Sequence, residues 1–542
     1  MGVNVQNISA REMLVLARKT AAKTLDVVGS STTKRLNLCL GLLSNTPTRE
    51  RLSDFAQALS HLDIDQRHYW IGTLYTLLLP PAIRRAQATY FTPPHLSRAL
   101  LKLVRDAGFD PLHHTAIDPA AGGAAFLSTL AAEMHSAGAK PASIFSRLHG
   151  MEIDRGLAKL SEALIAARVG MRIREGSLVA VKDALRARLA ATYDLVIANP
   201  PYGRISPSEV STDKWRDVCH PGHLNKYALF AELCLRLSKP GGLVALVLPS
   251  SFVAGPLYGR LRSYIREKAE VLALGDVSTR NDVFVDVAQD VSVLVARTGV
   301  AHRADKPVSF GNVTRIGPFK PSSAGLLPSA PDMPWIWSGK QRGIAVGGAT
   351  LADYGAVIRA GYFVWNRELE RLSNRRRSKL DFPLIWARNI RPPHFCRPHA
   401  KRGKGVNFVR FEQESSGIIR THALVMQRTT NNSQPRRLVA ARVSPSVITR
   451  WGGFVTENHT IIITAPTVKV LNVLRFLLNS AAADARYRRL SGTASVSVNL
   501  LRALDLPSPH SLGASVAKFG FSEEAIERAY AASALEASRV FA

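Results

Sequence analysis

The sequence predicts an α/β protein built on a doubly wound, mostly parallel sheet. Between Tyr90 and Arg297, short runs of β-branched and aliphatic residues alternate with segments of helical length. Some of these runs end in a side chain that can bind a ligand, namely Asp118, Glu152 and Asn199. Polar groups at that end of a strand are typical of the ligand edge in open parallel sheets.

The composition describes a globular chain with a large positive charge. Its 542 residues are too many for one ordinary domain, and 46% hydrophobic with 21% charged residues exclude a disordered protein. The 71 Lys and Arg residues exceed the 41 Asp and Glu residues and leave a formal charge of +30. Such an excess indicates a polyanionic partner, above all nucleic acid, although a genome composition that favours arginine would also contribute.

The cysteines predict neither a metal site nor a disulfide framework. There are four, without CxxC or metal-ligand spacing: Cys39, Cys219, Cys234 and Cys396. They are expected to be reduced thiols in a cytoplasmic protein. The sequence has no signal-peptide pattern and no apolar run long enough to span a membrane, so no membrane partner is expected.

Residues 1–88 are predicted to form a helical extension. Aliphatic residues recur there at helical intervals, and Pro80-Pro81 ends the pattern. The segment is expected to pack on the following domain, which is predicted over residues 89–300. Near the start of that domain, Thr92 precedes two prolines and a helix over Leu96–Val104, which predicts a helix cap with a purely structural role.

Two strand ends point to a nucleotide-like cofactor. A strand over 115–117 ends at Asp118 and leads through small residues, up to Gly123, into a helix that reaches Met134. Small residues there let backbone N–H groups approach a ligand closely. The next strand ends at Glu152, and an acid at this place can accept hydrogen bonds from ribose hydroxyls. The pair predicts an adenosine-bearing cofactor.

The remaining strands of the sheet are assigned from short apolar runs flanked by turn signals. A helix over Lys226–Leu237 ends at Lys239-Pro240-Gly241-Gly242, because proline and glycine stop helices. The predicted strands are Arg172–Leu178, Leu195–Ala198, Leu243–Pro249, Val271–Gly275 and Val291–Ala296.

The tetrapeptide Asn199-Pro200-Pro201-Tyr202 carries the strongest local signal for chemistry. Two successive prolines force the backbone out of the sheet directly after a buried strand. The amide of Asn199 both accepts and donates hydrogen bonds, the carbonyl of Pro200 is a second acceptor, and Tyr202 has a flat ring for stacking. These groups suit an exocyclic amino group on an aromatic ring. The structural alternative is an ordinary turn after a core strand.

The C-terminal part is predicted to be a linker or loop-rich domain entry followed by a basic module. Pro, Ser and Gly become frequent over residues 301–335, and residues 336–542 combine basic clusters with aromatic residues and short β-like runs. Such a module would track the DNA backbone and read bases, whereas a solvated arginine-rich face is the alternative. The candidate DNA contacts are Arg388, Lys401, Arg402, Arg436 and Arg437.

In chain order, these motifs resemble those of the gamma-class DNA adenine-N6 methyltransferases of the TaqI type. The set comprises Phe91-Thr92-Pro93-Pro94, Asp118-Pro119-Ala120, Glu152-Ile153-Asp154, Asn199-Pro200-Pro201-Tyr202 and Lys226-Tyr227 with Lys239-Pro240-Gly241-Gly242. The tetrapeptide alone is shared with other amino methylases, but the ordered set is specific. The resemblance covers Tyr90 to Arg297 and extends loosely to three C-terminal segments: Pro383–Ile390, Glu457–His459 and Leu477–Ser480.

The resemblance implies the class I S-adenosylmethionine-dependent methyltransferase fold, a C-terminal α+β target-recognition domain, and S-adenosylmethionine as the methyl donor. Asp118 and the small-residue loop would surround the methionine part of this cofactor, and Glu152 would bind the ribose hydroxyls. The implied cofactor-binding residues are Thr92, Asp118, Pro119, Ala120, Gly122, Glu152, Ile153, Ser177 and Asn199.

The resemblance also implies that the target adenine is flipped out of duplex DNA. The implied catalytic residues are Asn199, Pro200, Pro201 and Tyr202. Asn199 and the Pro200 carbonyl would bind the N6 amino group, and Tyr202 and Phe284 would stack on the two faces of the base. The expected setting is a monomeric, cytoplasmic and nucleoid-associated enzyme of a restriction-modification or phage-defence system, with a cognate restriction endonuclease as a candidate partner.

Two positions depart from the family pattern. The family loop usually reads Asp-Pro-Ala-Cys-Gly-Ser-Gly, whereas Ala121, Gly123 and Ala124 stand at the Cys, Ser and last Gly. Alanine disfavours a positive φ, so a different turn or weaker cofactor binding is expected. The acid that commonly meets the cofactor's adenine is also absent in register, where Gly176-Ser177 stands and Glu175 comes one place early.

Other interpretations of the function stay open at this point. Enzymes that methylate an RNA base or a protein glutamine also use Asn-Pro-Pro-Tyr, and charge does not distinguish RNA from DNA. A glutamine methylase has no need of a large basic module. In another class of function, the chain would be a DNA-binding protein whose cofactor site has decayed.

Overall fold

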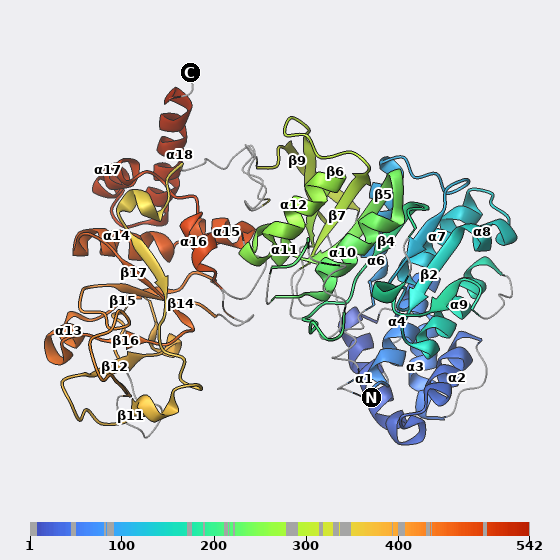
Figure 1. Ribbon diagram of the computed structural model, residues 1–542, viewed down its shortest axis with the longest axis horizontal. Helices are drawn as coiled ribbons and strands as arrows, with labels where there is room; N and C mark the ends of the chain where they lie inside the picture. The colour runs from blue at the N-terminus through green and yellow to red at the C-terminus, as the bar shows by residue number, and fades with distance from the viewer. Residues whose placement is uncertain are drawn as a thin grey trace. The chain divides into compact units, whose positions relative to one another are not determined.

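The computed structural model divides into two compact units, Met1–Gly339 and Lys340–Ala542 (Figure 1). The structure describes residues 8–44, 50–80, 83, 91–170, 176–187, 190–210, 215, 217–220, 223–277, 291–313, 318–328, 335, 348–392, 394–398, 407–429, 434, 436–490 and 496–540.

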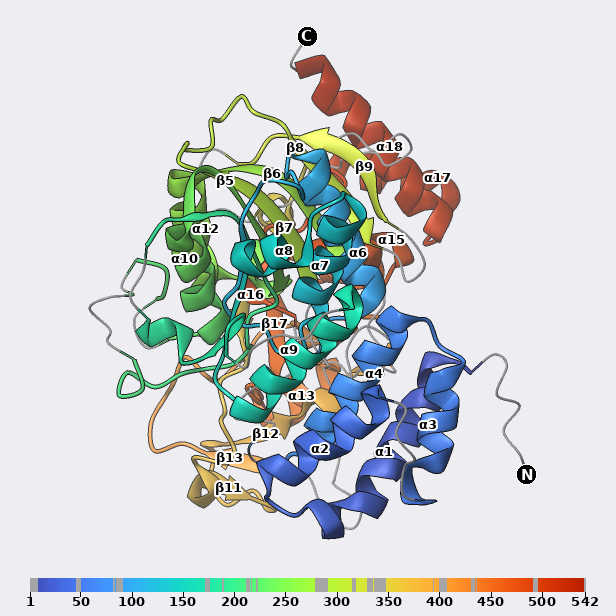
Figure 2. The same cartoon turned by 90° about the vertical axis from the view of Figure 1, so that its right-hand side faces the viewer.

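Four helices form the N-terminal part of the first unit: α1 (Ala10–Val28), α2 (Thr32–Leu43), α3 (Ser53–Ser60) and α4 (Ile64–Leu77). The Ser9 and Glu12 side chains cap α1 reciprocally, which satisfies backbone N–H groups at its first turn. The apolar faces of the four helices share a core with Leu157, Leu160 and Leu164 of α9 (Arg155–Val169). The N-terminal helices therefore pack on the following domain through α9 (Figure 2).

A nine-stranded sheet forms the centre of the first unit, in the order β3-β2-β1-β4-β5-β7-β6-β8-β9. Its first five strands are parallel neighbours, and β7 runs antiparallel between β5 and β6. The bounds are β1 (Ala116–Asp118), β2 (Leu148–Glu152), β3 (Val179–Val181), β4 (Tyr193–Ala198), β5 (Ser238–Pro249), β6 (Ala269–Val277), β7 (Val291–Thr298), β8 (Val308–Val313) and β9 (Phe319–Gly325). The predicted doubly wound, mostly parallel sheet is confirmed.

Helices cover both faces of this sheet (Figure 2). One face carries α6 (Pro94–Asp106), α7 (Ala125–Ser136) and α9, and the other carries α10 (Lys226–Leu237) and α12 (Gly259–Lys268). The shorter helices are α8 (Pro141–Arg147) and α11 (Ser251–Ala254). Because both faces are covered, the last four residues of β4 are all buried, which explains why the strand is a continuous apolar run.

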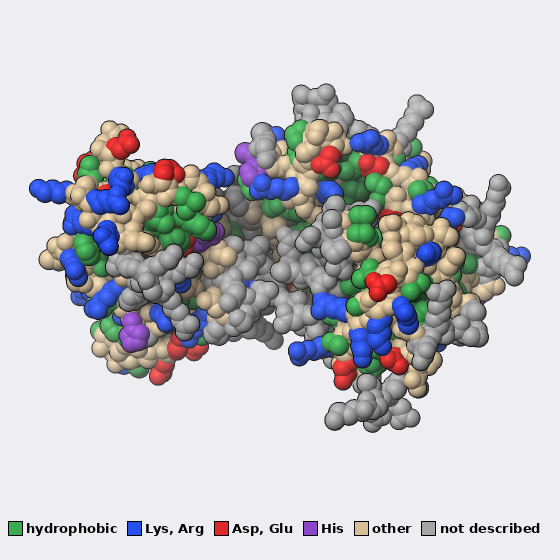
Figure 3. Space-filling view, turned by 90° about the horizontal axis from the view of Figure 1, so that it is seen from below, with side chains coloured by type: hydrophobic (Ala, Val, Ile, Leu, Met, Phe, Trp, Pro, Cys, Tyr) green, Lys and Arg blue, Asp and Glu red, His purple; other side chains and the backbone are tan. Residues whose placement is uncertain are grey.

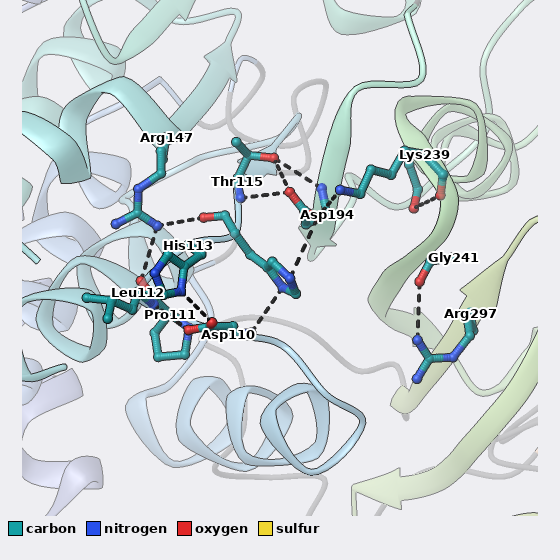
Figure 4. A network of polar contacts seen from close by, with 12 residues as sticks. Asp110, Pro111, Leu112, His113, Thr115, Arg147, Asp194, Lys239, Gly241 and Arg297 are labelled. Atoms are coloured by element: carbon teal, nitrogen blue, oxygen red, sulfur yellow. Dashed lines mark hydrogen bonds and ion pairs between the residues drawn. The ribbon is translucent and has the colours of Figure 1, made fainter.

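A polar network ties the amino ends of three strands together (Figure 4). The Asp194 carboxylate, in β4, accepts hydrogen bonds from the N–H and the hydroxyl of Thr115 at 3.0 and 2.7 Å, and Thr115 directly precedes β1. It also pairs with the Lys239 ammonium group in β5. Burial alone would raise the pKa of Asp194, but the hydrogen bonds from Lys239 and Thr115 outweigh it and lower the pKa to about 2. These contacts fix where the three strands start.

Two predictions about the sheet are wrong. The third strand is Val179–Val181 rather than Arg172–Leu178: residues 176–178 form a turn, and 171–175 lie outside the described residues. Residues 301–335 are predicted to be a linker or loop-rich domain entry, but the structure places β8 and β9 there. Because β9 is an edge strand that pairs on one side only, a segment containing Pro321 is compatible with it.

The second unit is an α+β assembly with two four-stranded sheets, in the orders β10-β17-β14-β15 and β11-β13-β12-β16. The strands are β10 (Val357–Ala360), β11 (Leu372–Ser373), β12 (Asp381–Ile385), β13 (Phe408–Arg410), β14 (Leu424–Gln427), β15 (Ala440–Arg442), β16 (Val455–Thr456) and β17 (Thr460–Thr464). The helices are α13 (Pro445–Trp451), α14 (Val468–Leu478), α15 (Ala481–Leu490), α16 (Val498–Arg502), α17 (Pro509–Phe519) and α18 (Glu523–Val540).

Two of the C-terminal segments that the sequence singled out meet in this unit. The Ala387 N–H donates to Glu457 Oε1 at 2.8 Å, and the Glu457 N–H donates to the Ile385 carbonyl at 3.1 Å. Glu457 therefore connects the end of β12 to β16.

All four cysteines are buried free thiols. Among the described residues, no helix has both the length and the apolar character needed to cross a membrane.

Candidate active site

The carboxyl ends of β2, β1 and β4 lie side by side because these strands are neighbours in the sheet. Asp118 ends β1, Glu152 ends β2, and Asn199 directly follows β4. The parallel register pairs Asp118 with Gly150, two residues before Glu152. The structure thus brings together, at one edge of the sheet, the three polar residues that the sequence places at strand ends.

Asp118 and Glu152 form a pair of hydrogen-bond acceptors at this edge. Asp118 is 2% exposed and accepts the Ala120 N–H at 2.9 Å, whereas Glu152 accepts the N–H groups of Gly122 and Asp154 at 3.0 and 2.9 Å. Burial raises the pKa of Asp118 to about 8, and the nearby Glu152 carboxylate contributes to the rise. Burial also raises the pKa of Glu152, against the hydrogen bonds from Asp154 and Gly122. Both carboxylates are suited to a ligand that brings donors or a positive charge.

The loop after β1 keeps a left-handed turn despite its alanine. Ala124, immediately before α7, has φ 57° and ψ 27°, and Gly122 has φ 53°. An alanine in this conformation costs roughly 1–2 kcal/mol relative to glycine. Ala124 thus adopts the positive φ that alanine disfavours, and the surrounding contacts hold the strained backbone. One of them is the hydrogen bond from the Ser161 hydroxyl to the Gly122 carbonyl.

Gly123 packs against Phe91, a residue that the sequence did not place in the site. A Cβ added at Gly123 would overlap the ring of Phe91, which is itself 7% exposed. The same ring lies against Gly72 of α4. Phe91 therefore packs directly on the backbone of the loop, and this contact explains why glycine stands where the family has serine. No local signal in the sequence reveals it, because the two residues lie far apart in the chain.

The amide of Asn199 is held from both of its ends. Its Nδ2 donates to Thr92 Oγ1 at 3.1 Å, and its Oδ1 accepts the Tyr202 hydroxyl at 2.8 Å. The prediction that Thr92 caps the next helix is wrong: Pro93 is the N-terminal cap residue of α6, without a side-chain cap bond. Thr92, which is 4% exposed, instead orients the amide of the tetrapeptide.

Tyr202 is more enclosed than a stacking platform would be. It is 8% exposed, its hydroxyl also reaches the Val247 carbonyl at 3.3 Å, and burial raises its pKa. Its ring meets that of Tyr227 edge to face, with centroids 6.4 Å apart, and Tyr227 packs on Tyr258. Stacking of Tyr202 on a base remains a prediction, as does that of Phe284, which lies outside the described residues.

A helical acid organises the turn where the family's third-strand acid is missing. The Glu162 carboxylate, on α9, accepts the backbone N–H groups of Gly176, Leu178 and Val179 at 2.8, 2.8 and 3.0 Å. These bonds fix the turn that carries the exposed residue Ser177. Sequence analysis missed Glu162, since a single acid within an otherwise ordinary helix gives no signal. Ile153, the other predicted contact on this side, is 59% exposed directly after Glu152.

The predicted DNA contacts of the second unit differ in exposure. Arg388 is exposed and its guanidinium lies over the Trp386 ring, and Arg436 is exposed and pairs with Glu523 at 3.7 Å. Arg437 is 2% exposed, and its backbone N–H donates to Asp484. Its assignment as a DNA contact is corrected, because a buried guanidinium cannot reach a phosphate. Lys401 and Arg402 lie outside the described residues.

The region that contains this site matches a known family. Residues 68–323 match the model of the family described as N-6 DNA Methylase. This region is an N-6 DNA methylase domain. It includes α4, the Phe91 and Thr92 segment, the whole strand-end site and the sheet as far as β9.

Similar proteins extend beyond the methylase domain. The type II methyltransferase M.PstI of Providencia stuartii is 23% identical over 350 residues, which cover 61% of this chain and 68% of that protein. The type II methyltransferase M.BsuBI of Bacillus subtilis is 23% identical over 476 residues, which cover 77% and 87%. Among solved structures, the type IIL restriction-modification enzyme MmeI in complex with DNA has a TM-score of 0.52 at 12% identity, covering 97% of this chain and 94% of that chain.

S-adenosylmethionine is the methyl donor that the sequence predicts, and the donor and acceptor groups of the strand-end site fit it. The cofactor carries an ammonium group and two ribose hydroxyls, and the buried acceptors Asp118 and Glu152 are able to take such donors. The strained turn at Gly122 and Ala124 leaves the loop backbone close to both carboxylates. Asp118 and the loop would hold the methionine part and Glu152 the ribose.

Proposed function

We propose that this chain methylates the N6 amino group of a flipped-out adenine within a specific duplex DNA sequence. The observation that carries the proposal is the clamped amide of Asn199 at the end of β4, beside Asp118 and Glu152. An amide in this place has a fixed acceptor and a fixed donor direction, so it can align an exocyclic amino group without rearranging itself during the reaction.

The roles of the side chains follow from their hydrogen bonds. When bound, S-adenosylmethionine supplies an electrophilic methyl group. Asn199 Oδ1 and the Pro200 carbonyl would accept the two N6 hydrogens, which directs the nitrogen lone pair at that methyl group. Thr92 would keep Nδ2 of Asn199 turned away from the base, since a hydroxyl oxygen accepts this donor.

The Tyr202 hydroxyl occupies the acceptor that the base requires. Its 2.8 Å bond to Asn199 Oδ1 would be exchanged for the bond from N6 when adenine enters. The ring would then become the stacking face predicted from the sequence. Entry of a flipped base therefore includes a local movement of Tyr202.

The biological setting proposed is restriction-modification or phage defence. The chain is similar over most of its length to type II methyltransferases, and its formal charge of +30 suits a polyanionic duplex. We place the enzyme in the bacterial cytoplasm as a monomer, with a cognate endonuclease as its companion in the system.

The test is transfer of a labelled methyl group to duplex DNA, ribosomal RNA and a protein extract in parallel. Duplex DNA is expected to be labelled, and sequencing of the product would give the modified base and its site. Asn199→Ala should lower transfer at least about 100-fold, far more than it weakens cofactor binding. The exposed Asn312→Ala in β8 serves as the matched control. Labelling of RNA or protein in place of DNA would reject the proposal.

A further inference from the structure

A basic groove lies on the second unit, beside the start of β12 and the end of α13. Its lining includes Arg376, Arg377, Lys379, Arg420, Arg450 and Trp451. The five basic side chains are exposed, and Trp451 is partly exposed. None of these residues is among the DNA contacts predicted from the sequence. We call this feature the Trp451 groove.

The loop that lines one side of the groove is fixed by a buried acid. Asp381, at the start of β12, is fully buried, and its Oδ2 accepts the N–H groups of Arg377 and Ser378 at 2.6 and 3.0 Å. The Arg376 Nε donates to the Ser378 carbonyl at 3.1 Å, which curls the loop further. The carboxylate thus fixes the backbone of the loop, whose basic side chains Arg376, Arg377 and Lys379 are exposed.

Trp451 lines the groove beside this loop. The guanidinium groups of Arg376 and Arg450 lie 5.6 and 4.6 Å from the centroid of its ring, and Phe408 packs edge to face on the same ring at 5.0 Å. An arginine held on an aromatic face keeps its charge and its planar N–H fork for an anion. The ring therefore holds two positive charges close together without neutralising them.

The acidic content of the groove is low. Within the part of the chain that the structure describes, Glu414 is the one carboxylate in the lining, and it pairs with Arg420. Arg420 also donates to the Gly452 carbonyl at 2.7 Å and lies over the Phe382 ring. The remaining basic residues leave the groove strongly positive, and like charges this close repel one another unless an anion lies between them.

We infer that the Trp451 groove binds the phosphate backbone of duplex DNA, an inference that rests on the proposed function for the choice of DNA as the polyanion. A row of arginines and lysines on a fixed loop can follow successive phosphates, which repeat along a duplex, whereas a single small anion would engage only part of it. Lys and Arg side chains also gather on the face of the second unit seen in Figure 3. The groove supplies affinity and orientation, and base reading belongs to other parts of the unit.

The test is the salt dependence of duplex binding, measured by fluorescence anisotropy with the full chain and without methyl donor. In the Arg376→Gln, Arg377→Gln, Arg450→Gln triple variant, the slope of log K against log salt should fall by about 2 to 3, and affinity at low salt by at least about tenfold. The matched control removes three exposed positive charges outside the groove, Lys469→Gln, Lys518→Gln and Arg528→Gln on α14, α17 and α18, and should leave the slope near the wild-type value.

A variant expected to bind duplex DNA more tightly distinguishes loss of the groove's charge from misfolding. Glu414→Gln removes the carboxylate of the groove and should tighten duplex binding about two- to fivefold, with a steeper slope. A wild-type slope in the triple variant, or an unchanged duplex affinity in Glu414→Gln, would contradict DNA binding by the Trp451 groove. An RNA duplex that competes as well as DNA would overturn the choice of polyanion. A wild type that binds DNA through the groove but transfers no methyl group would refute the proposed function alone.

Discussion

The side chain of Asn199 donates from Nδ2 to the Thr92 hydroxyl at 3.1 Å, although 107 residues separate the two in the sequence. This contact joins the segment before α6 to the end of β4, and it fixes which end of the amide faces the Tyr202 hydroxyl. A residue expected to cap a helix is thus a positioning residue for the proposed catalytic amide.

Thr92→Val removes the acceptor and keeps the shape of the side chain. Asn199 Nδ2 would lose its partner and the amide its fixed orientation, so kcat should fall about tenfold, which corresponds to about 1.4 kcal/mol. The KM for S-adenosylmethionine should change less than kcat, and Thr92→Ser, which keeps the hydroxyl, should restore most of the rate. Steady-state kinetics on duplex DNA measures both constants. An unchanged kcat in the valine variant would show that Thr92 has no role in positioning.

The sequence predicted the parts of the fold and site that local signals encode. The strand before Asn199, the acids that end β1 and β2, and the helix over Lys226–Leu237 each have a hydrophobic run and a nearby breaker, and the structure has them all. Each of these features depends on a few consecutive residues, so a single short segment of the sequence is enough to predict it.

The features that sequence analysis missed depend on residues brought together by folding. Burial of Arg437, the placement of Glu162 on the backbone near Ser177 and the contact between Phe91 and Gly123 involve segments distant in the chain. The strands β8 and β9 were missed for another reason. The turn-like composition of β9 is tolerated because this strand lies at the sheet edge, and propensity alone does not say that a segment will lie there.

Gly123→Ala tests the contact between Phe91 and the cofactor loop. The added methyl group would overlap the buried Phe91 ring, so the free energy of unfolding should fall by about 1–3 kcal/mol. In a Phe91→Ala background the same change should cost much less, because the ring that blocks the methyl group is gone. The control is Gly513→Ala within α17, where a Cβ meets nothing within 4 Å and about 0.5–1 kcal/mol of stabilisation is expected. Equal costs of Gly123→Ala in both backgrounds would contradict the contact.

The raised pKa of Asp118 predicts that cofactor binding depends on pH. In the free protein the pKa is about 8, so the side chain holds a proton at neutral pH, whereas a bound ammonium group favours the carboxylate. Affinity should therefore rise with pH from about 6 to about 7.5, with close to one proton released per cofactor bound. Calorimetry in buffers of different ionisation enthalpy measures this release. Asp118→Asn should abolish it.

The control for Asp118 is a second acid with a raised pKa. Burial raises the pKa of Glu232, on α10, to about 7 despite its partner Arg236, and this residue does not belong to the strand-end site. Glu232→Gln should bind the cofactor with the wild-type pH dependence. Loss of the dependence in Glu232→Gln and its retention in Asp118→Asn would reverse the assignment.

The pKa of Asp194 is lowered, in contrast to that of Asp118, and this shift predicts how the stability of the fold depends on pH. Its pKa is about 2 in the folded protein, below the ordinary value of about 4 in an unfolded chain, so the folded state binds the proton less readily. The stabilisation that the ionised Asp194 carboxylate provides is complete above about pH 4. It is lost as the pH falls through about 2, because the unfolded state takes up the proton first.

Asp194→Asn should lower the free energy of unfolding at neutral pH by about 2 kcal/mol and make it less dependent on pH between these values. Urea unfolding at several pH values measures both, and the exposed Asp305→Asn should leave stability unchanged. Since Asp194 fixes the starts of β1, β4 and β5, an unaltered stability in Asp194→Asn would mean that hydrophobic packing alone sets the register of the strands that carry Asp118 and Asn199.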